Sequence, residues 1–174
     1  MSSRSALLVV ATFILVAGTT RADEFGKFGR DATPDEVTSW DISVGPDGTG
    51  LPPGSGTAKQ GEAVYVAKCL VCHGEKGMGA LALPLAGGIG TIGQPNQLKT
   101  IGSFWPYATT IFDYVFTAMP YPETKSLTHD ETYALTAYLL RINGIIGEND
   151  TIDAQTLPKV RMPNRDNFIP YIKE

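Results

Sequence analysis

Two cysteines and a histidine stand together in the segment KCLVCHGEKG, which begins at Lys68. Cys69 and Cys72 are the only cysteines of the chain, and His73 is one of its two histidines. Residues three apart on a helical turn face the same way, so both thiols reach toward one ligand beside the imidazole. Three chemistries use such residues: a zinc site, an exchanging disulfide and a covalently attached haem.

Zinc and disulfide exchange explain the motif less well than haem does. A closed zinc site needs four nitrogen or sulfur ligands, and beyond the motif only His129 is available. A thioredoxin-like pair needs a βαβ context, and the sequence has no strand pattern. Haem offers two vinyl groups that each accept a thiol, and its iron takes the adjacent imidazole. We therefore expect one covalent haem c on Cys69 and Cys72, with His73 as an iron ligand.

The other axial ligand decides between electron transfer and small-molecule chemistry. The thioether candidates beyond Met1 are Met78, Met119 and Met162. Met78 follows His73 too closely to cross to the other side of a haem, and packing is the default role of Met162 in the tail. Met119 is 46 residues beyond His73 and precedes a proline. We predict Met119 as the ligand, with an ordinary core methionine as the alternative.

The first 22 residues have the pattern of a cleaved export signal. Arg4 precedes an apolar run over residues 6–17, and small residues follow as far as Ala22. The run is shorter than the ~20 residues that cross hydrocarbon as a helix. We expect cleavage near Ala22, a periplasmic mature chain and no membrane span in that mature form.

Charge and cysteine usage exclude other classes. Two of the 14 basic residues and none of the 18 acidic residues fall in the first 22 positions, which gives the mature chain a formal charge of −6. Without a basic stripe, the chain is not expected to bind nucleic acid. An acidic surface instead favours a positively charged docking face on at least one protein partner. Two cysteines provide no disulfide framework for an exported chain.

Three regions follow the signal: an N-terminal arm (23–56), a folded domain (57–147) and a C-terminal tail (148–174). The arm has no sustained hydrophobic period and is rich in glycine and proline. A short helix is expected near Pro34, with Thr33 as its cap. The arm also has apolar residues that favour packing over the domain surface, namely Trp40, Ile42, Val44 and Leu51.

The domain has three predicted helices. A capping box at residues 57–60 opens the first, which delivers the cysteines. The second begins near Pro106 and ends before Pro120, so Met119 lies at its end. A capping box at residues 128–131 opens the third, which closes at Gly144. The apolar positions expected to give the first helix its period are Ala63, Val64, Ala67 and Val71.

The loop over residues 74–102 is too long for a compact domain unless it wraps a ligand. Trp105 and Tyr107, just beyond this loop, are candidates to donate hydrogen bonds to a haem propionate, with core packing as the alternative. The residues expected to exclude water from the haem are Leu81, Leu83, Leu85, Ile111, Phe112, Val115 and Phe116.

Over about Thr57–Gly147 the sequence resembles class I cytochromes c. The resemblance is carried by Gly61 and Tyr65, the Cys69–His73 motif, LPLAG at Leu83–Gly87, AMP around Met119, and LTHDETYALTAYL in the last helix. It implies an all-α, cytochrome c-like fold around one haem. It further implies that Gly61 lets Tyr138 approach closely, and that Pro84 offers its carbonyl to the His73 imidazole.

A narrower resemblance concerns the segments TSWDISVGPDGTGLPPGSGTAKQGEAVY and GSFWPYATTIFDYVFTAMPY. They are similar to cytochrome subunits of bacterial sulfite dehydrogenases and of the related Sox sulfur dehydrogenase. This similarity implies a molybdenum-containing partner that performs catalysis, and a downstream cytochrome or oxidase that takes the electrons. The single haem motif favours the monohaem sulfite dehydrogenase subunit. Two alternatives are a general carrier to a terminal oxidase, and a haem enzyme or gas-binding protein with an open iron site.

Overall fold

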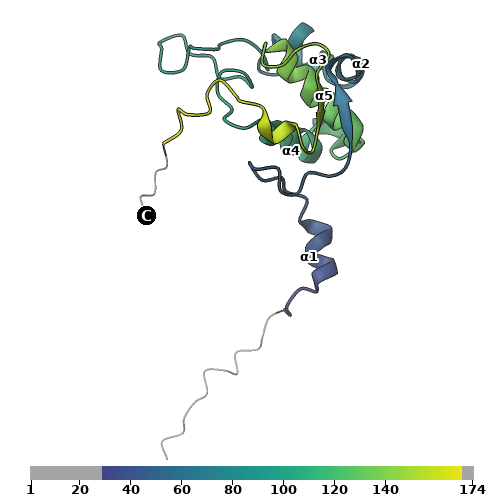
Figure 1. Cartoon of the computed structure of the whole chain (residues 1–174). Coiled ribbons are helices and arrows are strands. Elements are labelled where there is room, and N and C mark those ends of the chain that lie inside the picture. The colour runs from purple at the N-terminus through teal and green to yellow at the C-terminus, as the bar shows by residue number, and fades with distance from the viewer. Residues whose placement is uncertain (1–28, 170–174) are drawn as a thin grey trace, which may run out of the picture.

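A computed structural model describes residues 29–169 (Figure 1). The predicted export signal and the first residues of the arm fall outside the described residues. The elements in this range are α1 (Pro34–Trp40), β1 (Ser55–Thr57), α2 (Ala58–Lys68), α3 (Leu70–His73), η2 (Glu75–Gly77), α4 (Ala108–Ala118), η3 (Tyr121–Glu123), α5 (His129–Ile142), β2 (Thr151–Asp153) and η4 (Leu157–Lys159). Within residues 29–169, no helix has the length and apolar character to cross a membrane.

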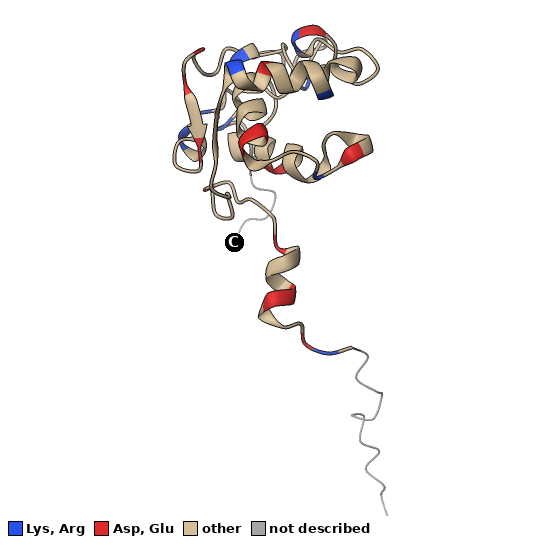
Figure 2. Cartoon of the chain, turned by 90° about the vertical axis from the view of Figure 1, so that its right-hand side faces the viewer, with Lys and Arg blue, Asp and Glu red and all other residues tan. Residues whose placement is uncertain are grey.

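The arm has two parts, of which only the second packs against the domain. Its second part packs on the domain: the Val44 amide donates to the Asp113 carboxylate at 3.0 Å, and the Tyr133 hydroxyl donates to the Pro52 carbonyl at 2.8 Å. Helix α1 instead extends away from the domain in both views (Figures 1 and 2). Trp40 is 86% exposed, so the expectation that it packs over the domain surface is wrong.

Local capping fixes where the helices begin. The predicted boxes form at all three sites, with Thr33, Thr57 and Thr128 as N-caps. Each threonine hydroxyl accepts from the third helical amide, and the side-chain oxygen of that third residue accepts from the backbone amide of the threonine. Helix α4 begins two residues later than expected because Tyr107 has an extended backbone.

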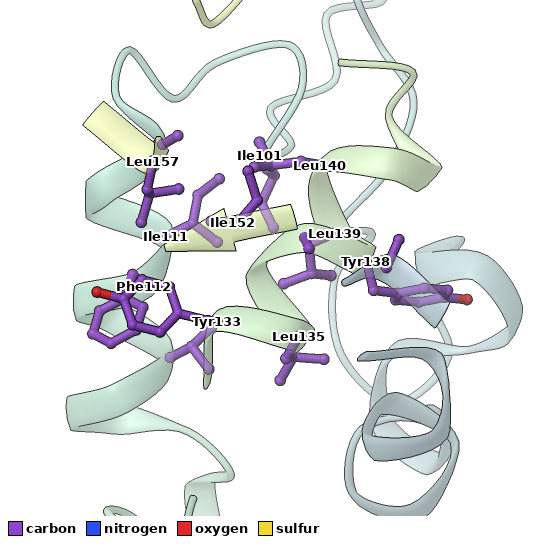
Figure 3. Packing of buried hydrophobic residues seen from close by; sticks show 14 of the residues in the cluster. Ile101, Ile111, Phe112, Tyr133, Leu135, Tyr138, Leu139, Leu140, Ile152 and Leu157 are labelled. Carbon is purple, nitrogen blue, oxygen red and sulfur yellow. The ribbon is translucent and has the colours of Figure 1, made fainter. Parts of the chain in front are cut away.

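Helix α5 forms the centre of the domain, with nine buried residues and with α2 and α4 packed against it (Figure 3). At Gly61 the backbone of α2 approaches so closely that a Cβ atom would overlap the Ala134 carbonyl. The three atoms nearest to that Cβ are backbone atoms of α5, at Ala134 and Leu135. The Tyr138 ring, which was expected to approach Gly61, packs against Tyr65 one helical turn further along α2, with ring centroids 5.0 Å apart.

This backbone contact also decides which face of α2 is buried. The buried residues are Ala58, Gly61 and Tyr65. The predicted apolar period is wrong for most of its positions, since Ala63 and Ala67 are exposed and Val71 is 77% exposed. Small residues allow the helices to touch through their backbones, so the larger apolar side chains of α2 do not mark its inner face.

The C-terminal tail packs on the domain and pairs with the end of the arm. Strand β2 pairs antiparallel with β1, with Gly56 opposite Ile152. No strand was expected, because three-residue strands are too short to show an alternating pattern. The tail then contributes Ile152, Leu157 and Met162 to the hydrophobic core. These three buried residues attach the tail to the domain.

Candidate cofactor site

A cavity of about 640 Å³ lies among the end of α2, α3, the loop after α3, α4 and α5. This volume falls within the ~300–1,000 Å³ typical of cofactor sites. Six of the seven predicted site residues line it: Cys69, Cys72, His73, Pro84, Trp105 and Met119. The fold thus brings together residues up to 50 positions apart in sequence.

The cysteine motif enters the cavity through a break between two helices. Helix α2 ends at Lys68, and Cys69 caps it with φ −122° and ψ −29° before α3 begins. The amides of Cys72 and His73 both donate to the Cys69 carbonyl, at 3.2 and 2.9 Å. One tight turn therefore presents two free thiols and an imidazole to the same cavity.

The environment of the thiols does not suit disulfide exchange. Burial, with a smaller contribution from the neighbouring Cys72, raises the pKa of Cys69 to about 11, whereas exchange is favoured by a lowered thiol pKa. His129, the remaining candidate for a zinc ligand, packs edge-on against Phe116 at 5.2 Å. Among residues 29–169, no three histidine, cysteine or acidic side chains form a cluster suited to a metal ion.

The His73 ring is oriented by a backbone carbonyl. Its Nδ1 lies 3.3 Å from the carbonyl oxygen of Leu83, the residue before the predicted Pro84. A carbonyl acceptor there favours the proton on Nδ1 and leaves Nε2 as the metal-binding nitrogen. Pro84 acts indirectly: its ring packs against Gly79, where an added Cβ would lie 3.0 Å from the Pro84 Cγ. The proline therefore shapes the loop that carries the Leu83 carbonyl.

Of the three methionines in the described residues, only Met119 lines the cavity. It caps the C-terminus of α4, where its amide donates to the Val115 carbonyl at 3.2 Å. Met78 is 64% exposed at the surface, and Met162 is 1% exposed in the hydrophobic core. The two alternatives for a thioether ligand therefore lie elsewhere in the fold.

The cavity wall is mainly apolar, but it includes only part of the predicted set. Five members of that set line it, namely Leu81, Leu83, Leu85, Ile111 and Val115. Phe112 and Phe116 do not, because they lie on another face of α4; Phe112 packs against Tyr133 with ring centroids 4.4 Å apart. Leu81 and Leu83 are each 82% exposed while lining the cavity, so their apolar surfaces are available to a flat apolar ligand.

Trp105 and Tyr107 have different environments. Trp105 lines the cavity and packs edge-on against Tyr114 at 5.7 Å. Tyr107 does not line the cavity, and the Arg165 guanidinium of the tail lies 4.0 Å from its ring centroid. The expectation that Tyr107 belongs to the haem environment is therefore not supported, because its ring contacts the tail.

Sequence reasoning missed several residues of the wall. Leu135 and Leu139 lie one helical turn apart on α5, a spacing that could have identified them. Lys99 comes from the long loop and carries no local signal; its Nζ lies 4.9 Å from the Phe104 ring centroid. The other missed residues are Tyr65, Lys68, Ala82, Thr100, Ile101, Tyr114, Pro120, Tyr121 and Pro122.

Comparisons with known proteins agree with this geometry. The family model for cytochrome c matches residues 58–143. The chain is 41% identical to a chain in the crystal structure of the sulfane dehydrogenase SoxCD from Paracoccus pantotrophus, with a TM-score of 0.77. That match covers 83% of this chain and 71% of the other.

A second structure, the thiosulfate dehydrogenase TsdBA from Marichromatium purpuratum in its as-isolated form, is 26% identical. It covers 48% of this chain and 17% of that chain with a TM-score of 0.38, which is too low to carry weight. No curated protein sequence matches the chain.

Proposed function

This chain belongs to the cytochrome c family, and we propose that Cys69 and Cys72 bind its single covalent haem c, with His73 and Met119 as axial ligands. The observation that carries this proposal is the cavity lined by all four side chains. Each residue type has the chemistry required: two thiols for the vinyl groups, an oriented imidazole and a thioether.

When bound, haem supplies a one-electron couple between ferrous and ferric iron. His73 and Met119 would hold the iron, and with both bound no iron site would be open to a substrate. The chain therefore passes single electrons and leaves catalysis to a partner. A thioether ligand and an apolar wall both favour the ferrous state, because they disfavour the extra positive charge of ferric iron.

The electron donor is a molybdenum-containing dehydrogenase of sulfite or a related sulfur compound, and the acceptor is a downstream cytochrome or oxidase. The similarity to a chain of SoxCD supports this assignment, because it covers 83% of the chain and so extends well beyond residues 58–143. Regions outside the haem domain are thus shared with a chain of a sulfur-compound dehydrogenase. The periplasm is the compartment of this reaction, in agreement with the export signal predicted for residues 1–22.

Reduction of the haem by a co-expressed molybdenum protein tests the function. The haem-loaded chain is mixed with that protein and either sulfite, thiosulfate or a sulfane-sulfur donor, and ferrous haem is followed by absorbance. We expect rapid reduction only when the partner and its substrate are both present. A chain that accepts electrons equally well without the molybdenum protein would instead be a general carrier.

A further inference from the structure

Helix α1 exposes two apolar side chains, those of Val37 and Trp40, to solvent. Val37 and Trp40 are three residues apart, a spacing that puts them on the same side of a helix, and they are 52% and 86% exposed. None of the residues of α1 is buried. Figure 1 shows the helix extended away from the domain. A tryptophan in this position has most of its apolar surface in water.

The helix is nevertheless held in shape by its own residues. Seven residues are too few for a stable isolated helix, so local contacts have to support it. Thr33 and Glu36 form a capping box, and the Arg30 guanidinium donates to both carboxylate oxygens of Glu36, at 2.7 and 2.5 Å. The hydrogen bonds from Arg30 and Thr33 lower the pKa of Glu36 to about 2. A helix already ordered in this way loses less entropy when it binds.

The surroundings of the apolar pair are acidic. Four carboxylates lie on or beside α1, at Asp31, Asp35, Glu36 and Asp41, whereas Arg30 is the single cation of residues 30–41 (Figure 2). A second copy of this acidic chain would meet like charge, and anionic lipid would repel the same segment. A protein groove bordered by lysine or arginine complements both the charge and the apolar pair.

The position of α1 in the chain connects it to the haem domain. Beyond the helix, the Val44 amide is fixed to Asp113 on α4, and α4 also supplies Ile111 and Val115 to the cavity wall. A partner that binds α1 is thereby kept beside the haem-bearing domain. Such a tether raises the effective concentration of the electron donor without any contact to the haem.

We propose that α1 is a docking helix for the partner dehydrogenase, with Trp40 as the anchor that enters an apolar groove bordered by basic residues. This inference rests on the proposed function, because it names the same molybdenum-containing protein as the occupant. Tryptophan is enriched among the few interface residues that dominate binding, which fits one exposed ring on a preformed helix.

Binding of the purified molybdenum protein to the haem-loaded full chain tests the proposal, with Trp40→Ser compared with Ile169→Ser. Ile169 is 90% exposed in the tail and serves as a matched control for loss of surface apolar area. We expect Trp40→Ser to raise Kd by at least about tenfold and Ile169→Ser to leave it within about twofold. The limiting rate of haem reduction at saturating partner should be the same in all three proteins, because α1 docks the partner but does not carry the electron.

Each other outcome contradicts the proposal in a distinguishable way. Equal Kd values for Trp40→Ser and the unaltered chain refute docking by α1 while the proposed function stands. An unaltered chain that fails to bind the molybdenum protein refutes both. A dimer of the free chain that dissociates on Trp40→Ser assigns the helix to a second copy, and Trp40-dependent binding to phosphatidylglycerol vesicles assigns it to a membrane surface.

Discussion

Asn143 joins the end of α5 to the loop that holds the hydrogen-bond partner of His73. The side chain is 7% exposed. Its amide nitrogen donates to the carbonyls of Leu85 and Leu139, at 3.2 and 2.9 Å, and its oxygen accepts from the Gly87 amide at 3.2 Å. Replacing Asn143 with alanine removes all three bonds, so it tests whether α5 supports this part of the site.

The expected loss of stability follows from the partners that remain. The Leu85 carbonyl keeps a second bond from the Ile101 amide at 3.2 Å, whereas the Gly87 amide loses its acceptor, the Asn143 side-chain oxygen. Leaving a donor unpaired costs about 1–3 kcal/mol, and each bond that is merely lost costs about 1 kcal/mol. We therefore expect Asn143→Ala to lower the free energy of unfolding by about 3–5 kcal/mol.

Guanidinium unfolding of the haem-loaded protein, followed by circular dichroism, measures this loss. Asn164→Ala is the matched control, because Asn164 is similarly buried but makes only two side-chain bonds, donating to the Phe104 carbonyl at 2.8 Å and accepting from the Asn167 amide group at 2.7 Å. The control should lose about 2 kcal/mol. If Asn143→Ala loses no more than the control, the side chain does not hold the loop in place and the reasoning is refuted.

Three further variants test the ligand, the pH response and the helix contact. Met119→Ala should open the iron to carbon monoxide and abolish the methionine-to-iron absorption band; a band that persists would mean that another residue is the ligand. Burial raises the pKa of Tyr65 to about 12 in the folded chain. Its neutral form therefore contributes full stability below the unfolded pKa of about 10, and this contribution is lost as the pH rises from about 10 to about 12. Tyr65→Phe should therefore flatten the alkaline loss of stability, and it should cost about 1 kcal/mol at pH 7 through the hydroxyl bond to Gly74, at 2.7 Å. An alkaline unfolding curve identical to that of the unaltered chain would contradict this assignment. Gly61→Ala should destabilise the domain by about 1–3 kcal/mol in thermal unfolding, although alanine is the better helix former, because its Cβ overlaps the Ala134 carbonyl. A gain in stability would show that α2 and α5 have room to separate.

The parts of the fold that could be predicted from sequence depend on short-range chemistry. The capping boxes at Thr57 and Thr128 place two helix starts correctly, because their hydrogen bonds join residues only three apart. The pairing of β1 with β2 brings together segments about 95 residues apart, and three-residue strands leave no pattern to detect. The inner face of α2 was missed for a related reason, since it is defined by a backbone contact at Gly61.

At the site, too, the features that depend on neighbouring residues could be predicted, whereas those that depend on distant segments could not. The cysteine motif is local, and Met119 could be selected because its two rivals occupied unsuitable positions along the chain. Trp105 and Tyr107 look equivalent in sequence, yet contacts with Tyr114 and with Arg165 of the tail give them different environments. Such contacts depend on where distant segments pack, which the residues themselves do not indicate.

Net charge alone suggested an acidic surface that attracts a positively charged partner, and the structure resolves this charge into two regions. The acidic residues of α1 lie on the projecting arm, whereas the cavity wall contains two lysines, Lys68 and Lys99, and no acidic residue. A partner that engages both regions needs basic groups near α1 and acidic groups near the cavity rim. Opposite charge at two separate places selects one orientation of approach and disfavours its reverse, because reversal brings like charges together. Charge can therefore orient the electron donor toward the haem while the apolar pair on α1 slows its release.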